Sequence, residues 1–254
     1  MIVMKRVEPF VRLNFESLFK GVKPDYFKSF HIVDKGCEDG TIKYCKERIK
    51  DVVIHPLDFY IPKDKNGLPM TSGWQWDMAY SYDYVFRACG KSEWVVLTHP
   101  DLVYFDADKF FKGIENLIYD DLAIIAHGAW CIIRRRAYLE HSHLGLWPLF
   151  GTVLYEQSSG KYVIVGRRQV KEGDKFFTIE GIEMYELFLI ELQQYGWDCY
   201  HLKRKKPDIV LCIDHMAQCT EHDAGPEHDL IKNNRKRAEK RLKALTEGKN
   251  NWHV

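Results

Sequence analysis

Two short polar segments hold carboxylates at positions suited to binding a phosphorylated ligand and a metal ion. In residues 34–41 (DKGCEDGT), Asp34 directly follows a β-rich run, and two glycines allow a tight turn and close approach of a ligand to the backbone. In residues 98–102 (THPDL), Asp101 lies just beyond an apolar run. Asp34 can accept hydrogen bonds from a base or from ribose hydroxyls, and Asp101 can bind a divalent cation. Each segment is also typical of an ordinary turn.

A cation bound at Asp101 would act as a Lewis acid that neutralises a departing diphosphate without transferring a proton. Oxygen ligands suit Mg²⁺ or Mn²⁺, and the neighbouring imidazole of His99 favours Mn²⁺. The alternative is an Asx-type turn in which His99 is an ordinary hydrogen-bond donor. On the first interpretation, residues 98–102 predict a Mn²⁺ or Mg²⁺ site.

Two further groups of residues could take part in this chemistry. Histidines, cysteines and aspartates gather between residues 214 and 228, but their spacings match no closed zinc site of Cys and His ligands. Within this group the residues alone leave His215 as a structural or surface histidine, or as part of a zinc site. Trp147, in the loop of residues 145–148, belongs to the core or forms a platform for a sugar ring.

The elements that must position these residues alternate between strand and helix. Such alternation predicts βαβ units and a mainly parallel sheet with helices on both faces, and ligands of such sheets bind at the carboxyl ends of the strands. Thr41 is expected to cap the helix that it opens, and the strands at 152–155 and 162–165 are expected to form a hairpin. The predicted strands are residues 2–4, 29–33, 52–54, 94–97, 130–133, 152–155, 162–165 and 209–213, and the predicted helices are residues 10–19, 41–49, 73–89, 106–118, 183–195 and 226–245.

The composition excludes several classes of protein. The chain has 254 residues, of which 46% are hydrophobic and 29% charged, and this argues against a disordered or fibrous protein. With Lys+Arg 37 and Asp+Glu 36, the net charge of +1 gives no overall field that would attract nucleic acid or an acidic membrane. The seven cysteines are scattered without a CxxC pair, and no secretory signal or membrane span is expected. We therefore expect a cytoplasmic protein.

Four blocks of the sequence, in the right order, resemble the family 2 glycosyltransferases, which have the GT-A fold. Residues 30–48 (FHIVDKGCEDGTIKYCKER) resemble the nucleotide-binding block of that family, and residues 93–102 (EWVVLTHPDL) resemble the strand that leads into its metal-binding DxD motif. Residues 128–138 (GAWCIIRRRAY) and 183–200 are similar to a later strand and helix of the family. The resemblance covers residues 1–222.

The resemblance implies an α/β, GT-A fold and transfer of a sugar from a nucleoside-diphosphate sugar, with UDP favoured, to an acceptor hydroxyl. Asp34 matches the aspartate that contacts the nucleotide, and Asp101 matches the last aspartate of the DxD motif. His99 stands in place of the first aspartate, and His215 corresponds to a histidine ligand that follows the last core strand. The implied cofactor is Mn²⁺ or Mg²⁺. Additional candidates for contacts to the nucleotide are Arg6, Glu8, Lys35 and Thr98.

An inverting transferase needs a carboxylate to take the proton of the acceptor hydroxyl. Met184 occupies the position of that base in the resembling block, so we expect the adjacent Glu183, or else Glu180, to act as the base. A retaining mechanism with a different proton path stays open. The same carboxylates also fit a plain acidic helix start that the helix dipole stabilises.

We expect three parts of the chain and weigh three functions. Residues 1–118 are predicted to form a nucleotide-sugar-binding lobe, residues 119–225 a smaller acceptor and catalytic lobe, and residues 226–254 a basic helical tail. The acceptor is a glycan, a lipid, a protein or a modified nucleobase. The alternatives to a glycosyltransferase are a nucleotidylyltransferase of similar fold and a non-enzymatic module that binds nucleic acid or another partner through the tail and the Cys/His cluster.

Overall fold

The computed structural model describes the chain in several stretches, and the following description applies to them. They are residues 1–58, 73–127, 130–141, 152–156, 161–165, 176–178, 192–193, 195–202, 206–216, 229–249 and 252. Within these stretches, no helix has the length and apolar character needed to cross a membrane.

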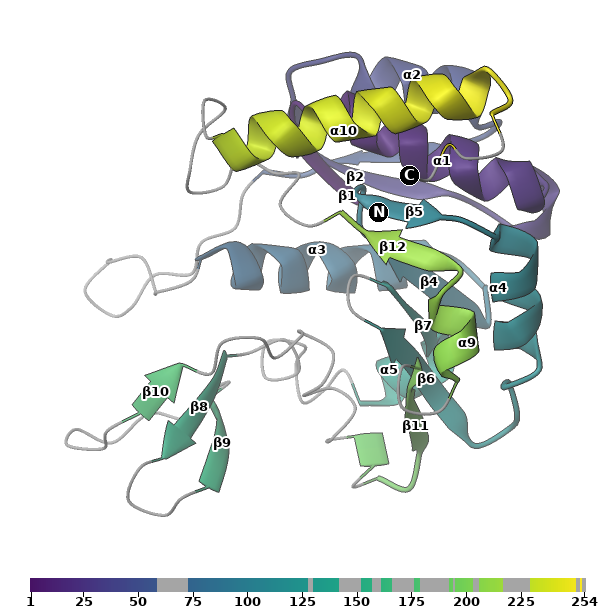
Figure 1. The fold of residues 1–254 in the computed structure, drawn as a ribbon. Helices are drawn as coiled ribbons and strands as arrows, with labels where there is room; N and C mark the ends of the chain where they lie inside the picture. Colours follow the sequence, from purple (N-terminus) through teal and green to yellow (C-terminus); the bar gives the residue numbers. More distant parts are fainter. Residues whose placement is uncertain are drawn as a thin grey trace.

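A parallel three-stranded sheet forms the N-terminal part of the fold (Figure 1). In sheet order its strands are β1 (Ile2–Lys5), β2 (His31–Cys37) and β3 (Val53–Pro56). The helices next to it are α1 (Glu8–Gly21) and α2 (Thr41–Arg48), and a short 3-10 helix, η1 (Pro24–Tyr26), follows α1. Figure 1 shows α1 and α2 on one side of these strands and α3 (Gly73–Ala88) on the other. Because the strands are parallel, the segments that follow them emerge at one edge of the sheet.

A second sheet of four strands carries the segment that leads to Asp101. In sheet order its strands are β11 (Asp198–His201), β6 (Leu122–His127), β7 (Trp130–Arg134) and β4 (Trp94–Thr98). Only β11 and β6 are parallel, whereas β6–β7 and β7–β4 are antiparallel. Helix α5 (Arg135–Glu140) follows β7 and packs on α3, where the rings of Phe86 and Tyr138 stack with centroids 3.8 Å apart.

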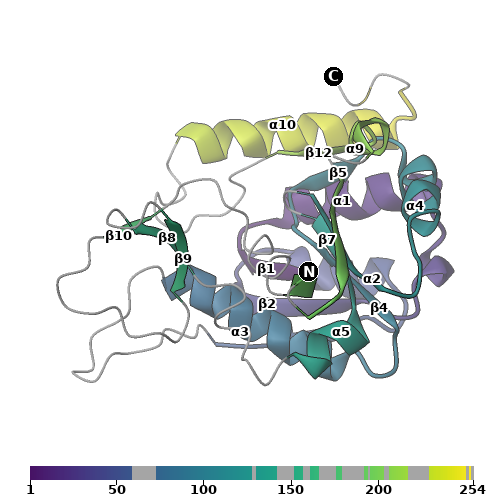
Figure 2. The same ribbon diagram turned by 90° about the horizontal axis from the view of Figure 1, so that it is seen from below.

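A two-stranded antiparallel sheet joins distant parts of the chain. It consists of β5 (Leu102–Tyr104) and β12 (Ile213–His215), with His215 opposite Leu102. The neighbouring helices are α4 (Ala107–Glu115), α9 (Pro207–Val210) and α10 (Asp229–Thr246). Figure 2, seen from below, shows α10 running beside this sheet, on the opposite side of the molecule from α3. A separate antiparallel sheet has the order β10 (Phe176–Thr178), β8 (Thr152–Glu156), β9 (Lys161–Val165).

The helices begin and pack as their sequences require. Pro9 lies in the first turn of α1, where its missing N–H costs nothing, and the Asp106 carboxylate accepts from the N–H of Lys109 at the start of α4. Helix α1 buries an apolar face in the main core, and α10 packs against it. The buried apolar residues of α1 are Phe10, Val11, Leu13, Phe15 and Leu18.

The architecture confirms the α/β class expected from the sequence, and it corrects three local expectations. The second sheet is mostly antiparallel. Thr41 does not cap α2, because it is the first residue of that helix and its N–H donates to Asp39. Residues 209–213 are not one strand, since Pro207 opens the short helix α9 and the strand begins only at Ile213.

The expected hairpin and helical tail also have structural counterparts. Strands β8 and β9 pair in antiparallel register, and α10 is the helix expected in the tail. The division at residues 118 and 225 stays a prediction. Strands from both sides of residue 118 share a sheet in β4–β7 and in β5–β12. The predicted helix at 183–195 falls mostly outside the described residues.

Candidate metal and nucleotide site

The turn between β4 and β5 carries His99 and Asp101, and a buried side chain of α1 holds its backbone. The amide nitrogen of Asn14 donates to the carbonyl oxygen of His99 at 3.1 Å and to that of Leu102 at 2.8 Å. The turn is closed by the N–H of Leu102, which donates to the carbonyl of His99. One turn further along α1, Ser17 Oγ accepts from the N–H of Tyr104 at 3.0 Å. Helix α1 therefore fixes both the turn and the strand that follows it.

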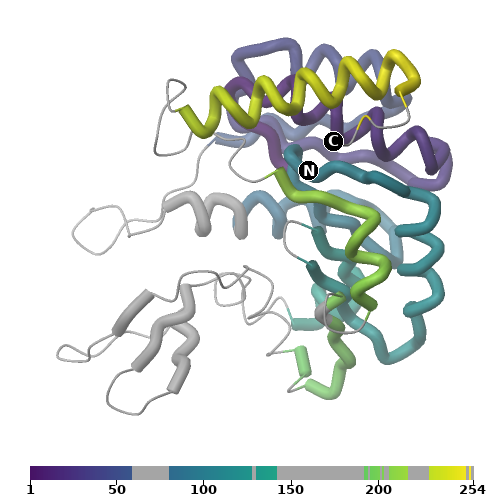
Figure 3. The backbone as a smooth tube through the Cα atoms, in the orientation of Figure 1, coloured from purple at the N-terminus to yellow at the C-terminus, as the bar shows by residue number. Residues whose placement is uncertain are grey.

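Strand β12 brings His215 to this turn from more than 100 residues away in the sequence. Its register against β5 places His215 opposite Leu102, and the N–H of Met216 donates to the carbonyl of Asp101 at 3.0 Å. Figure 3 traces this C-terminal segment in green beside the teal segment of β5. The backbone pairing thus places the His215 side chain next to Asp101.

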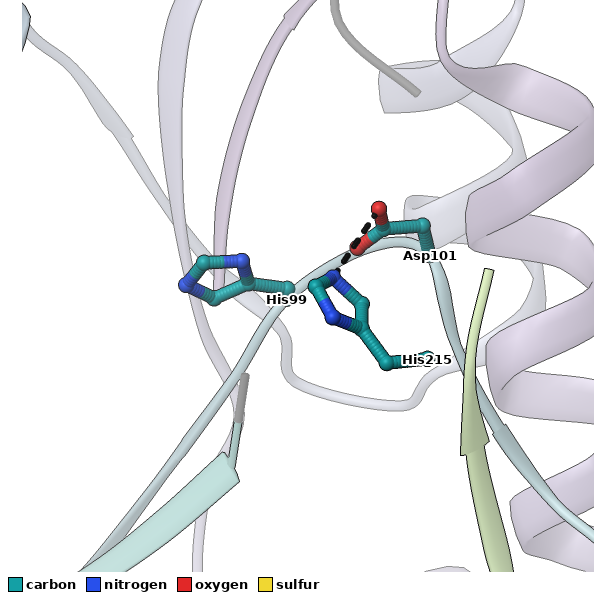
Figure 4. Close-up of side chains that lie close together, drawn as sticks. All are labelled: His99, Asp101 and His215. Atoms are coloured by element: carbon teal, nitrogen blue, oxygen red, sulfur yellow. Dashed lines mark ion pairs between the residues drawn. The ribbon is translucent and has the colours of Figure 1, made fainter. Parts of the chain in front are cut away.

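The three side chains form one cluster (Figure 4). His215 Nε2 lies 3.2 Å from Asp101 Oδ2, the His99 and His215 rings have centroids 5.8 Å apart, and one possible ligand atom from each residue lies within 4.8 Å of the others. Asp101 is almost fully buried, with 4% of its side chain exposed, whereas His215 is 37% exposed. Burial alone would raise the pKa of Asp101, but the hydrogen bond and charge of His215, with the charge of His99, hold that pKa below its ordinary value.

The cluster fits a divalent metal ion of the Mn²⁺ type. It offers two imidazole nitrogens and a carboxylate, a mixed set that suits Mn²⁺ better than Mg²⁺, which prefers oxygen alone. Asp101 Oδ1 is buried without a hydrogen-bond partner among the described residues, so an oxygen is available to a cation. With ligand bonds of about 2.1 Å, two ligands of one ion lie at most about 4.2 Å apart. The 3.2 Å between His215 Nε2 and Asp101 Oδ2 is within this limit.

Strand β2 extends to Cys37, so Asp34 lies within the strand and not after it, and the carboxyl-terminal end of β2 is arranged around the Asp34 carboxylate. Asp34 Oδ1 accepts from the N–H groups of Gly36 at 3.1 Å and Cys37 at 2.8 Å, and Gly36 has a φ of 79° that favours glycine. The next residue, Lys35, is buried, and its ammonium group donates to the carbonyl of Asp58 at 2.8 Å. Asp34 itself is partly exposed on its strand. These contacts hold the end of β2 and leave part of the Asp34 side chain accessible.

Arg6 and Glu8 lie beside the segment that follows β2. Arg6 pairs with Glu38 at 3.5 Å. Glu8 Oε2 accepts from the N–H of Gly40 at 3.0 Å, and Glu8 Oε1 accepts from Arg12 at 2.7 Å. Glu8 therefore holds this segment in place, and a nucleotide contact by either residue stays a prediction.

Helix α1 links the segment that follows β2 to the candidate metal cluster. Its first residue, Glu8, contacts Gly40 of this segment, and Asn14, six residues later, contacts the turn of His99 and Asp101. Six residues of α-helix span about 9 Å. The two predicted binding segments are therefore fastened to one rigid element at points about 9 Å apart along its axis.

The remaining predicted residues are placed as follows. Thr98 ends β4, with its hydroxyl donating to the carbonyl of His99 at 3.3 Å. Glu180, Glu183 and Trp147 lie outside the described residues, as do Cys219, His222 and His228 of the Cys/His group. Within the described part of the chain, the only cluster of three potential metal ligands is the one at Asp101.

The sequence analysis missed Asn14 and Ser17, which are both fully buried. The available signal was their position: two polar residues on the face of α1 that also carries Phe10, Leu13 and Leu18. A cavity of about 480 Å³ is lined by side chains of β1, β2 and β4, Thr98 among them, but by neither Asp34 nor Asp101. Since its lining lacks both predicted binding aspartates, we do not assign the donor site to it.

The fold is similar to that of a solved glycosyltransferase. The structure of the galactosyltransferase LgtC in complex with donor and acceptor sugar analogues matches with a TM-score of 0.51 and 12% identity, over 98% of this chain and 96% of that chain. The mannosyltransferase PcManGT from Pyrobaculum calidifontis, in complex with GDP-Man and Mn²⁺, matches with a TM-score of 0.45 and 11% identity, over 97% and 73%. The second score is too low to support an assignment. No family model and no curated protein matches the sequence. The first likeness shows that the chain has the α/β fold of GT-A type.

Proposed function

We propose that the protein is a metal-assisted glycosyltransferase that moves a sugar from a nucleoside-diphosphate sugar to an acceptor hydroxyl. The observation that supports this most strongly is the convergence of His99, Asp101 and His215 at the end of β4. Helix α1 holds that cluster and the segment that follows β2 together, as a donor with a nucleoside at one end and a diphosphate at the other requires. Membership of family 2 stays part of this proposal.

Each group has one task in the reaction. Asp34 binds the base or ribose of the donor, with Arg6, Glu8, Lys35 and Thr98 as further contacts. The bond between the anomeric carbon and the diphosphate oxygen breaks, and a bond to the acceptor oxygen forms. Glu183, or else Glu180, takes the acceptor proton, and Trp147 stacks on a sugar ring. A Mn²⁺ ion held by His99, Asp101 and His215 would supply positive charge to the departing diphosphate.

The finer assignments belong to the same proposal. UDP is the favoured nucleotide and Mn²⁺ the favoured ion, and the acceptor is a glycan, a lipid, a protein or a modified nucleobase. The six described cysteines form no disulfide, which supports a reducing, cytoplasmic location. The binding-module alternative loses support because α10 packs against α1 and so belongs to the folded core.

Thermal unfolding with a panel of nucleotide sugars tests the proposal. We expect one of the UDP-, GDP-, CMP- or dTDP-sugars to raise the melting temperature in the presence of Mn²⁺. At 100 times the Kd the stabilisation is about 2.7 kcal/mol, or about 5–10 °C for a chain of this size. Asp34→Ala and Asp101→Asn should abolish the shift.

The matched control is Asp108→Asn. Asp108 is an exposed carboxylate that pairs only with Lys112 in the described contacts, at 2.8 Å, and its loss should leave the shift intact. A panel in which no nucleotide sugar stabilises the protein, with or without Mn²⁺, would contradict the proposed function. Release of the free nucleoside diphosphate from the stabilising donor then measures turnover. The variants Glu183→Gln and Trp147→Ala, measured in the same assay, test the proposed base and the proposed sugar platform.

A further inference from the structure

An arginine on the last helix is buried against the strand that carries His215. The side chain of Arg241, on α10, is only 5% exposed, and its Nη1 donates to Asp214 Oδ2 at 2.8 Å. Its guanidinium carbon lies 5.7 Å from the centre of the Phe105 ring. Charged side chains are rarely buried, and a buried ion pair adds little stability by itself. The burial of Arg241 therefore calls for an explanation other than stability alone.

The position of Asp214 supplies that explanation. Asp214 precedes His215 in the three-residue strand β12, where it lies opposite Val103 of β5. Successive side chains of a strand point to opposite faces, so Asp214 faces α10 while His215 faces Asp101. The ion pair with Arg241 thus fixes the rotation of β12, and that rotation determines where the His215 imidazole lies.

Arg241 is itself held in place by the rest of the fold. Helix α10 buries Ile231, Ala238 and Leu245 and packs against α1, and Arg235 Nη2 donates to the carbonyl of Arg6 at 2.6 Å. Helix α1 holds the other half of the cluster through Asn14. Both halves of the cluster are therefore positioned by the same pair of packed helices.

We propose that Arg241 is a positioning residue for the metal site: through Asp214 it keeps His215 within binding distance of Asp101. This inference rests on the metal site of the proposed function. It also gives the C-terminal helix a role in the site, because removal of residues beyond 230 would remove this contact together with the tail.

The test measures Mn²⁺ affinity in the whole chain without donor or acceptor, from the electron paramagnetic resonance signal of free Mn²⁺. Arg241→Met keeps most of the side-chain volume and removes the charge and hydrogen bonds. Loss of a group that orients a metal ligand weakens metal binding about 10–100-fold, and we expect a loss of this size. Arg241→Lys should recover part of the affinity.

Arg237→Met is the matched control. Arg237 lies on the same helix and approaches the same oxygen, Asp214 Oδ2, but at 3.6 Å and with 51% of its side chain exposed. Its replacement should change Mn²⁺ affinity less than 2-fold. A general loss of stability is excluded by comparing melting temperatures and by measuring every variant well below its melting temperature.

A double-mutant cycle separates positioning from folding. In a His215→Ala background, Arg241→Met should cause no further loss of Mn²⁺ affinity, because the ligand that it positions is already absent. If Arg241→Met fails to fold, the double variant Asp214→Asn/Arg241→Met removes both charges of the ion pair. We expect it to fold and to bind Mn²⁺ more weakly than the wild type.

The two possible failures are distinguishable. If His215→Ala binds Mn²⁺ as the wild type does, the proposed metal site is wrong and the inference fails with it. If His215→Ala loses affinity but both Arg241→Met and the double variant bind Mn²⁺ as the wild type does, the metal site stands and the role of Arg241 is overturned. An equal loss on Arg241→Met in the wild-type and His215→Ala backgrounds also overturns it.

Discussion

Replacement of Asn14 by leucine is a direct test of how the turn of His99 and Asp101 is held. Leucine keeps the size of the side chain but removes the amide that donates to two carbonyls, those of His99 and Leu102. The buried carbonyl of Leu102 loses its side-chain donor, at a cost of about 1–3 kcal/mol. The carbonyl of His99 still accepts from the N–H of Leu102 and from the Thr98 hydroxyl, so the loss of its third donor costs about 0.5–1.5 kcal/mol. Asn14 Oδ1 is itself buried without a partner in the described contacts, and its removal recovers about 1–3 kcal/mol.

With the middle of each range, the net destabilisation expected for Asn14→Leu is about 1 kcal/mol. For a chain of this size, that corresponds to a melting temperature about 2–4 °C lower. Thermal unfolding followed by circular dichroism, with and without Mn²⁺, measures it. Because the turn that carries Asp101 loses its support, we also expect the stabilisation by Mn²⁺ to become smaller.

Ser17→Ala is the matched control for this variant. Ser17 lies on the same buried face of α1, and its hydroxyl contacts the N–H of Tyr104 and the carbonyl of Asn14, not the turn. It should lower the melting temperature but leave the Mn²⁺-dependent shift unchanged. A Mn²⁺-dependent shift of Asn14→Leu as large as that of the wild type would refute the reasoning, because the turn of Asp101 would then be held without the Asn14 amide.

Three further predictions concern other sites. Asp101→Asn should reduce Mn²⁺ affinity at least 10-fold in the same resonance assay, since it removes the only anionic ligand of the cluster in the described residues; an unchanged affinity would place the ion elsewhere. Burial first, and then the nearby charge of His55, lowers the pKa of His31 to about 4, so the unfolded chain binds a proton below about pH 6.5 that the folded chain refuses down to about pH 4. The melting temperature should therefore fall as the pH falls through this window. If the melting temperature of His31→Gln falls as much over the same pH range as that of the wild type, the prediction is wrong. A Cβ at Gly21 would lie 2.8 Å from the backbone nitrogen of Asp108, whereas one at Gly113 would meet only the side chain of Ile209; Gly21→Ala should destabilise the protein by about 1–3 kcal/mol and Gly113→Ala by less, and the reverse order in urea unfolding would count against the packing.

Local sequence signals predicted most of the elements and the segments that carry the site. The apolar runs at 29–33 and 94–97 and the helical pattern at 106–118 are each set by neighbouring residues, and the structure has β2, β4 and α4 there. The short segment at 209–213 was harder, because an apolar run of this length fits a strand or a helix turn equally well. In the structure Pro207 is the first residue of a short helix, a position where proline is favoured.

The support of the site could not be predicted in the same way, because it depends on contacts between distant residues. Asn14 and Leu102 are separated by 88 residues, and Asp214 and Arg241 by 27. The composition of a basic helix predicts that it is exposed to solvent. Nothing in the local sequence indicates that Arg241, one of seven basic residues in positions 232–243, is buried. The pairing of β12 with β5, which delivers His215, is likewise a tertiary contact.

The pairing of β5 with β12 has a consequence for the order in which the protein is built. A ribosome releases the chain from its N-terminus, so α1, β4 and the turn of Asp101 emerge long before the last ligand of the cluster. A nascent chain that ends before residue 215 has two of the three side chains of the cluster, and one that ends between residues 215 and 240 has all three but lacks Arg241. If the cluster binds an ion as proposed, the complete site therefore forms only after most of the chain has been synthesised.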